Sequence, residues 1–115
     1  ILIDYKTGKV NLSQARSDNL RDPQLAAYAL AISGLKGTFF AQLDEEKPKL
    51  SGLSTNDNLD AKFKSVPGIT FDNELEKWSI QLEQTATDFV EGKANISPTQ
   101  GYCLNCHLSG FCRIQ

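Results

Sequence analysis

The 115-residue sequence contains no methionine and a single histidine. Because residue 1 is not methionine and the chain opens within the apolar run Ile1-Leu2-Ile3, which is typical of a core strand, we expect the C-terminal part of a longer protein. No apolar stretch approaches the roughly 20 residues needed to span a bilayer, and the start does not resemble a signal peptide. These absences predict a cytoplasmic protein without a membrane segment.

A surplus of positive charge is also missing, since 12 Lys and Arg residues are set against 14 Asp and Glu residues. A dedicated DNA-binding module usually carries a basic surplus, so the net charge of −2 disfavours that class. The hydrophobic share of 40% is ordinary for a folded protein and argues against wholesale disorder. The length allows one domain at most.

The first part of the chain predicts a strand, a loop and a short helix. The β-branched, apolar opening Ile1–Lys6 is typical of a strand, and the polar, aperiodic residues 9–21 predict a loop. Asp22 is then the expected N-cap of a helix with Pro23 at its first position. This helix runs through Ile32, and the glycine that follows it suits a C-terminal cap.

The second part predicts a hairpin and a long helix. Strands at residues 37–43 and 49–53 flank a polar turn, and a short strand is possible near residues 68–71 within an irregular stretch. A helix capped by Asp72 is expected over residues 73–92, with apolar residues at helical spacing on one face, namely Leu75, Trp78, Leu82, Phe89 and Val90. The fold class is therefore mixed α/β, with an irregular tail from Asn95 onward.

The end of the first strand carries two functional side chains, Asp4 and Lys6. Strand side chains alternate with period two, so both point to the same face of a sheet. A carboxylate can hold the divalent metal that phosphodiester hydrolysis requires, and a lysine can stabilise the charge that develops on the phosphate. The alternative is an exposed Asp/Lys pair of the kind common at strand ends.

Gln24 and Tyr28 lie four residues apart on the first predicted helix and therefore on one face. A glutamine can hydrogen-bond a base edge or a phosphate, and a tyrosine offers a stacking ring with a polar tip. In the alternative interpretation Tyr28 covers the core and Gln24 is solvated.

All three cysteines fall within one C-terminal stretch, as Cys103, Cys106 and Cys112. This clustering and the odd count favour metal or cluster ligation over a disulfide framework. Three cofactors compete. The order Cys103-x-x-Cys106-His107 matches c-type haem attachment, which would require export. Zinc bound by three Cys and His107 is a second option, and an iron–sulfur cluster, which needs a fourth thiolate, is the third.

The order of these motifs resembles a known family. Asp4-Tyr5-Lys6-Thr7-Gly8, then Gln24-x-x-x-Tyr28, then the long helix and the cysteine tail are similar to the C-terminal half of the RecB-like branch of the PD-(D/E)xK nucleases. AddB-type helicase–nuclease subunits and related bacterial DNA-repair proteins are the nearest likeness. The resemblance implies a restriction-endonuclease-like core, with residues 1–115 as the C-terminal part of one nuclease domain and residues 95–115 as a Cys-rich tail.

The resemblance also implies roles for individual residues. Asp4 would be a ligand of Mg²⁺ or Mn²⁺, Lys6 the catalytic lysine, and Gln24 and Tyr28 the helical motif beside the catalytic centre. A [4Fe–4S] cluster would be bound by Cys103, Cys106 and Cys112, with a fourth cysteine and a further metal-binding aspartate outside this chain. The isolated chain is then expected to be inactive.

These implications lead to two main functional hypotheses. The first is an exo- or endodeoxyribonuclease of DNA repair and recombination that acts on DNA with a helicase or helicase–nuclease partner subunit. The second is a catalytically inactive nuclease fold that serves as a scaffold or DNA-binding module of a repair complex. A c-type haem protein fragment is a remote third.

Overall fold

The computed structural model describes residues 1–43, 47–55, 63–93, 95, 103 and 106–112. The chain divides into two compact units, Ile1–Gln84 and Thr85–Gln115. Three predicted features lie wholly or partly outside the described residues: the centre of the hairpin turn at 44–46, part of the irregular stretch at 56–62, and most of the tail between 96 and 105.

The first unit is built on a four-stranded mixed sheet. Its strands are β1 (Leu2–Lys6), β2 (Gly37–Gln42), β3 (Lys49–Ser54) and β4 (Phe63–Ser65), in the order β1-β2-β3-β4. β1 pairs with β2 in parallel, β2 with β3 antiparallel, and β3 with β4 in parallel. The antiparallel pair confirms the predicted hairpin, and the parallel pair β1–β2 needs the long crossover that lies between them.

That crossover contains three short helices where the sequence predicted one loop and one helix. Two 3₁₀ helices, η1 (Leu12–Ala15) and η2 (Ser17–Asn19), occupy the predicted loop. They are followed by α1 (Gln24–Ala31), which buries the apolar side of its turns at Leu25, Ala26 and Ala29. The sequence did not predict the two 3₁₀ helices, because short 3₁₀ turns need no apolar periodicity and the segment is polar.

The helix α1 does not start as predicted. Pro23 is its N-cap, with no side-chain cap hydrogen bond, so the expected role of Asp22 as N-cap is wrong. The end of the helix agrees with the prediction, since Ile32 is the C-cap and Gly34 takes a positive φ of 75°. Glycine reaches that backbone conformation without steric cost.

The long helix α2 runs over Phe71–Val90. It begins before the predicted start, so Asp72 lies inside its first turn and is not its cap, although an acidic residue there still suits the helix dipole. The second part of the predicted apolar face is also wrong, because Phe89 and Val90 are each 84% exposed.

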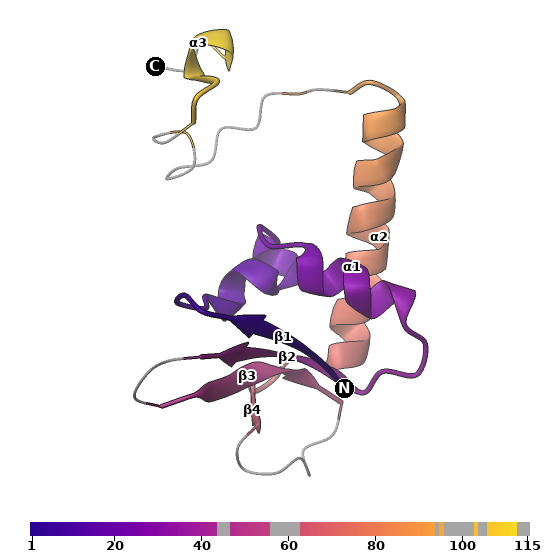
Figure 1. The fold of residues 1–115 in the computed structure, drawn as a ribbon. Coiled ribbons are helices and arrows are strands. Elements are labelled where there is room, and N and C mark those ends of the chain that lie inside the picture. The colour runs from indigo at the N-terminus through magenta and orange to yellow at the C-terminus, as the bar shows by residue number, and fades with distance from the viewer. Residues whose placement is uncertain (44–46, 56–62, 94, 96–102, 104–105, 113–115) are drawn as a thin grey trace. The chain divides into compact units, whose positions relative to one another are not determined.

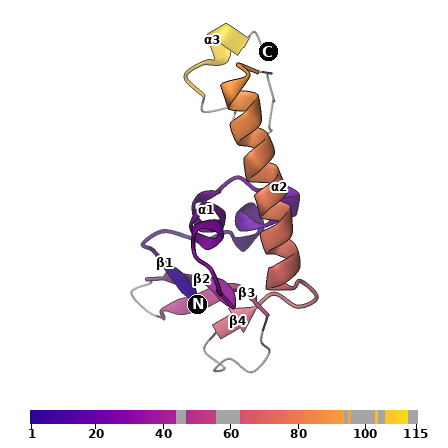
Figure 2. The same cartoon turned by 90° about the vertical axis from the view of Figure 1, so that its right-hand side faces the viewer.

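The helices α1 and α2 lie on the same face of the sheet in both views (Figures 1 and 2). Between them and the sheet, Ala26, Ala29, Leu53, Phe71 and Trp78 form a buried cluster. Phe71 and Trp78 meet edge to face with ring centroids 6.3 Å apart. Burial of these side chains is the main force that fixes the helices on this face.

The edge of the sheet away from β1 differs from its prediction. The third short strand is β4, whereas the strand expected near residues 68–71 is a turn at Gly68, with φ of 76°, followed by the start of α2. Gly52 on β3 is required where it stands, because a Cβ there would collide with the backbone oxygen of Thr38 on β2. The ring of Phe39 fills the neighbouring space and packs edge to face on Phe63.

The second unit contains the last turns of α2 and a short helix, α3 (Ser109–Cys112). The tail was predicted to be irregular, so α3 is an addition to that prediction. No helix within the described ranges has the length and apolarity to cross a membrane.

Candidate active site

Asp4 and Lys6 meet at the end of β1. As the period of a strand predicts, both side chains lie on the face that carries the helices, and Lys6 Nζ is 3.0 Å from Asp4 Oδ2. The Lys6 side chain is 29% exposed and the Asp4 side chain is 19% exposed, so solvent reaches this ion pair less than it reaches a typical surface pair. The alternative of a fully solvated Asp/Lys pair therefore does not describe this strand end.

The Asp4 carboxylate is a buried acceptor whose partner is a flexible lysine. Its Oδ2 is buried, and the charged group beside it is Lys6 Nζ at 3.0 Å. Buried carboxylate oxygens are almost always satisfied by a donor, a water molecule or an ion. The donor set at Asp4, a hard carboxylate oxygen, suits a divalent cation such as Mg²⁺ or Mn²⁺.

Gln24 and Tyr28 extend the site from β1 onto α1. Lys6 Nζ donates a hydrogen bond of 3.3 Å to Gln24 Oε1, and Gln24 Nε2 donates one of 3.3 Å to Tyr28 Oη. The two side chains share one helix face, as their spacing predicted. Gln24 is thus engaged with the strand residue, and Tyr28 is 49% exposed, which contradicts the alternative of a solvated Gln24 and a core-covering Tyr28.

Asp22 is a member of the site that sequence reasoning missed. Its Oδ2 lies 3.3 Å from Lys6 Nζ, and its side chain is 38% exposed. An aspartate directly before Pro23 carries the signal of a helix cap, and nothing in the local sequence distinguishes a cap from a partner of a lysine on a distant strand. The adjacent carboxylate could be found only from the way in which α1 packs against the sheet.

The electrostatic surroundings of Lys6 favour its charged form. The Asp4 carboxylate contributes most, and together with Asp22 it raises the pKa of Lys6 above its ordinary value, against the lowering effect of partial burial. The ammonium also stands 5.6 Å from the centroid of the Phe40 ring, within the range of a cation–π contact. Lys6 is therefore held as a cation by groups from two strands and from the start of α1.

A small cavity of about 130 Å³ adjoins Lys6 and Asp22, and Lys9, Asn11 and Gln14 also line it. A larger hollow of about 610 Å³ has Ile3, Tyr5 and Leu50 in its lining. Ile3 and Tyr5 alternate with Asp4 and Lys6 along β1 and so belong to the opposite face of the sheet. The larger hollow is therefore an apolar surface separate from the Asp4–Lys6 site.

The three cysteines belong to the second unit, as free thiols, with Cys106 exposed and Cys103 and Cys112 half-buried. The Cys106 amide donates to the Cys103 carbonyl at 3.3 Å, and the Leu108 amide donates to Cys106 Sγ at 3.4 Å. Within the part of the chain that the structure describes, no three His, Cys, Asp or Glu side chains are gathered as a metal site.

Comparison with known proteins agrees with the fold. The model of the PD-(D/E)XK nuclease superfamily matches residues 1–113. No curated protein and no solved structure gives a significant match. The mixed four-stranded sheet with its flanking helices is the restriction-endonuclease-like fold that the sequence predicted. Since the match extends over nearly all of its length, the chain belongs to the PD-(D/E)XK nuclease superfamily.

Proposed function

We propose that this chain contributes Asp4 and Lys6 to a metal-dependent site that hydrolyses DNA phosphodiester bonds. The observation that carries the proposal is the pairing of Lys6 Nζ with Asp4 Oδ2 at 3.0 Å, at the end of a strand in a chain of this superfamily. Nucleases of this kind generally use Mg²⁺ or Mn²⁺, and the hard carboxylate oxygens of Asp4 suit such an ion.

Each residue of the site has a distinct role in this proposal. Asp4 holds the cation, which when bound supplies a Lewis acid for the scissile phosphate and its attacking water. Lys6 places a positive charge beside the phosphate, where it stabilises the negative charge of the transition state. Gln24 orients the Lys6 ammonium through its hydrogen bond, and Tyr28 fixes the amide of Gln24 from the next turn of α1.

The finer assignment is to the RecB-like branch, as the C-terminal part of the nuclease domain of an AddB-type helicase–nuclease subunit or a related DNA-repair protein. Support comes from the motif order along the chain and from the Lys6–Gln24–Tyr28 contacts. On this proposal the remaining metal ligands lie outside residues 1–115, and this chain carries half of the site. The parent protein would act as an exo- or endodeoxyribonuclease in cytoplasmic DNA repair and recombination, beside a helicase subunit.

An iron–sulfur cluster at Cys103, Cys106 and Cys112 is a separate part of the proposal. Three thiols are one short of the four that such a cluster needs, and the described residues form no ready metal site. The residues present therefore do not fit a complete cluster, and no step of the reaction is assigned to it. Its role would be to stabilise the C-terminal tail.

Cleavage assays on the complete protein test the nuclease proposal directly. We expect Asp4→Ala and Lys6→Ala each to reduce cleavage of labelled single- and double-stranded DNA in Mg²⁺ or Mn²⁺ by about 10³-fold or more, because the first removes a ligand of the cation and the second removes the positive charge beside the phosphate. Both side chains are partly exposed, so circular dichroism and thermal melting should show a folded protein. Asp18→Ala, in η2, and Lys36→Ala are matched controls that should cleave normally.

Three outcomes would contradict the proposal or part of it. Full cleavage by both variants would show that the chemistry occurs elsewhere in the protein. A wild-type protein that binds DNA but does not cleave it with either cation would instead establish the inactive scaffold. The isolated chain of residues 1–115 is expected not to cleave, so activity from it alone would overturn the half-site.

A further inference from the structure

Lys6 has a carboxylate partner that the Asp-x-Lys motif does not contain. Its Nζ lies 3.0 Å from Asp4 Oδ2 on its own strand and 3.3 Å from Asp22 Oδ2, which precedes α1. A lysine has a flexible four-carbon stem and a point charge, so one partner alone does not fix the position of the ammonium. The second carboxylate approaches from a different element and limits that freedom.

The backbone of Asp22 is held in place before α1 begins. The Gln14 carbonyl accepts hydrogen bonds from the Arg21 amide at 2.7 Å and from the Asp22 amide at 2.9 Å. Pro23, with its restricted φ, then begins the helix as its N-cap without any side-chain cap. The Asp22 carboxylate is thus free of a capping role and is available to Lys6.

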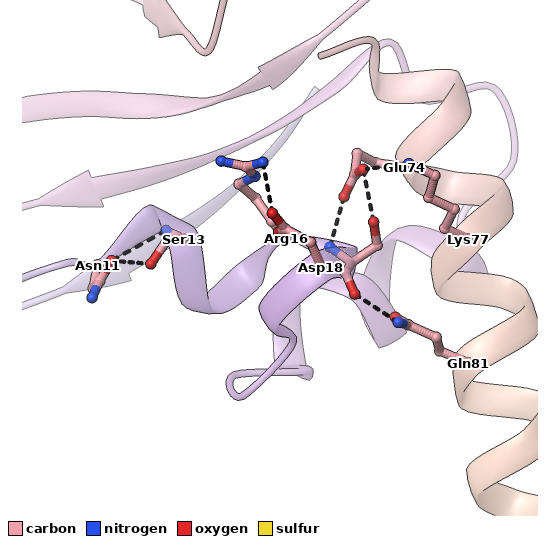
Figure 3. A network of polar contacts seen from close by, with 8 residues as sticks. Asn11, Ser13, Arg16, Asp18, Glu74, Lys77 and Gln81 are labelled. Carbon is pink, nitrogen blue, oxygen red and sulfur yellow. Dashed lines mark hydrogen bonds and ion pairs between the residues drawn. The ribbon is translucent and has the colours of Figure 1, made fainter. Parts of the chain in front are cut away.

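The segment of η1 and η2, which includes Gln14, is itself tied to α2 through Ser17. Figure 3 shows Glu74 and Gln81 of α2 facing this segment. The Ser17 amide and hydroxyl donate to the two oxygens of Glu74 at 2.7 and 2.8 Å, and Gln81 Nε2 donates to the Ser17 carbonyl at 2.6 Å. Glu74 is 4% exposed, and hydrogen bonds to a buried carboxylate are among the strong ones. The segment that leads to Asp22 is therefore anchored in the packed part of the first unit.

We propose that Asp22 is a positioning residue that retains the Lys6 ammonium when Asp4 is engaged by a cation. The inference rests on the proposed nuclease function. A cation held by Asp4 would compete with Lys6 for the carboxylate and repel the ammonium, and would thereby weaken the shortest ion pair of Lys6. Asp22 keeps an opposite charge beside Nζ and, with Gln24, prevents the side chain from moving toward solvent.

Removal of the Asp22 charge should therefore affect turnover more than binding. We expect Asp22→Asn in the complete protein to lower kcat by about 10- to 100-fold, because a displacement of about 1 Å in a catalytic group is enough for such a loss. The KM for DNA and the Mg²⁺ concentration for half-maximal rate should not change. Asp22→Glu, which keeps the charge, should recover part of the rate, and Asp18→Asn, in η2 of the same crossover, should match the wild type.

Each contrary result is informative. An unchanged kcat in Asp22→Asn would overturn the proposal, and a higher Mg²⁺ requirement would show that Asp22 is a metal ligand and not a positioning residue. Since Asp22 acts through Lys6, its substitution should add no further loss in a Lys6→Ala background. Independent, additive losses in the double variant would also overturn the proposal.

A chemical measurement separates this proposal from the nuclease proposal. Labelling with an amine-reactive reagent at fixed pH, followed by peptide mass spectrometry, reports the reactivity of Lys6 relative to Lys9. We expect Asp22→Asn to raise the labelling rate of Lys6 and to leave that of Lys9 unchanged. If the wild-type protein does not cleave DNA, the nuclease proposal fails, whereas an unchanged Lys6 labelling rate would refute the contact with Asp22.

Discussion

The two units of the chain differ in how their functional side chains are held. In the first unit, Lys6 contacts Asp22 and Gln24, which come from a different element and lie far along the sequence. In the second unit, the hydrogen bonds around the cysteines join near neighbours, such as the Cys106 amide with the Cys103 carbonyl. A site made by long-range contacts exists only when the fold forms, whereas the bonds between near neighbours among the described residues do not by themselves gather the thiols into one site.

The two units also differ in how they bury the apolar side chains of the helix α2. Its early turns bury Phe71 and Trp78 against the sheet, and both side chains are 0% exposed. Its last turn, in the second unit, leaves Phe89 and Val90 each 84% exposed. One apolar periodicity therefore continues along a helix whose two ends have different surroundings.

The largest expected effect comes from a comparison of those two ends. Trp78→Ala should lower the free energy of unfolding by about 3–5 kcal/mol, because it removes the largest buried side chain and leaves a cavity. Phe89→Ala should change it by no more than about 0.5 kcal/mol, as expected for an exposed position. Urea unfolding followed by circular dichroism measures both. Equal losses would show that the two ends of α2 are equally packed.

A smaller effect is expected at the polar anchor of the crossover loop. Glu74→Gln keeps the size of the side chain but removes the charge that accepts hydrogen bonds from the Ser17 amide and hydroxyl. We expect a loss of about 1.5–3 kcal/mol in the free energy of unfolding, the usual value of hydrogen bonds to a charged group. Glu83→Gln, at an exposed position of the same helix, is the control. If Glu83→Gln lowers the free energy of unfolding as much as Glu74→Gln, the effect comes from the loss of a negative charge on the helix and not from the contact with Ser17.

The smallest effect on the first unit is expected from the cysteines. Cys112→Ala should change the unfolding free energy of the first unit by less than about 0.5 kcal/mol, since the residue belongs to the second unit. If the proposed cluster forms in the complete protein, Cys112→Ala should also lower the iron content after anaerobic purification and speed protease cleavage within residues 85–115, because a bound metal stabilises the segment that holds it. His107→Ala is the companion variant. Loss of zinc in both variants would favour a zinc site over an iron–sulfur cluster. An unchanged metal content in both would show that the thiols bind no metal.

The local pattern of the sequence was sufficient for the pairs of residues within one element. The spacing of two in Asp4 and Lys6 and the spacing of four in Gln24 and Tyr28 fix which side chains share a face, because these periods follow from strand and helix geometry alone. The ends of α1 show the limit of such rules. The glycine signal at its C-terminus was correct, but the Asp22 signal at its N-terminus was not, because an ion pair with Lys6 competes with capping for the same carboxylate.

The sequence by itself thus determined the strand with its Asp-x-Lys end, the hairpin, the two main helices and the likeness to PD-(D/E)XK nucleases. Only the tertiary structure decided that Lys6 has a second carboxylate partner, that Glu74 is buried as the anchor of the crossover, and that Phe89 and Val90 are exposed among the described residues. The physical reason is common to all three. Periodicity assigns a side chain to a face, but its burial and its partners depend on which element packs against that face.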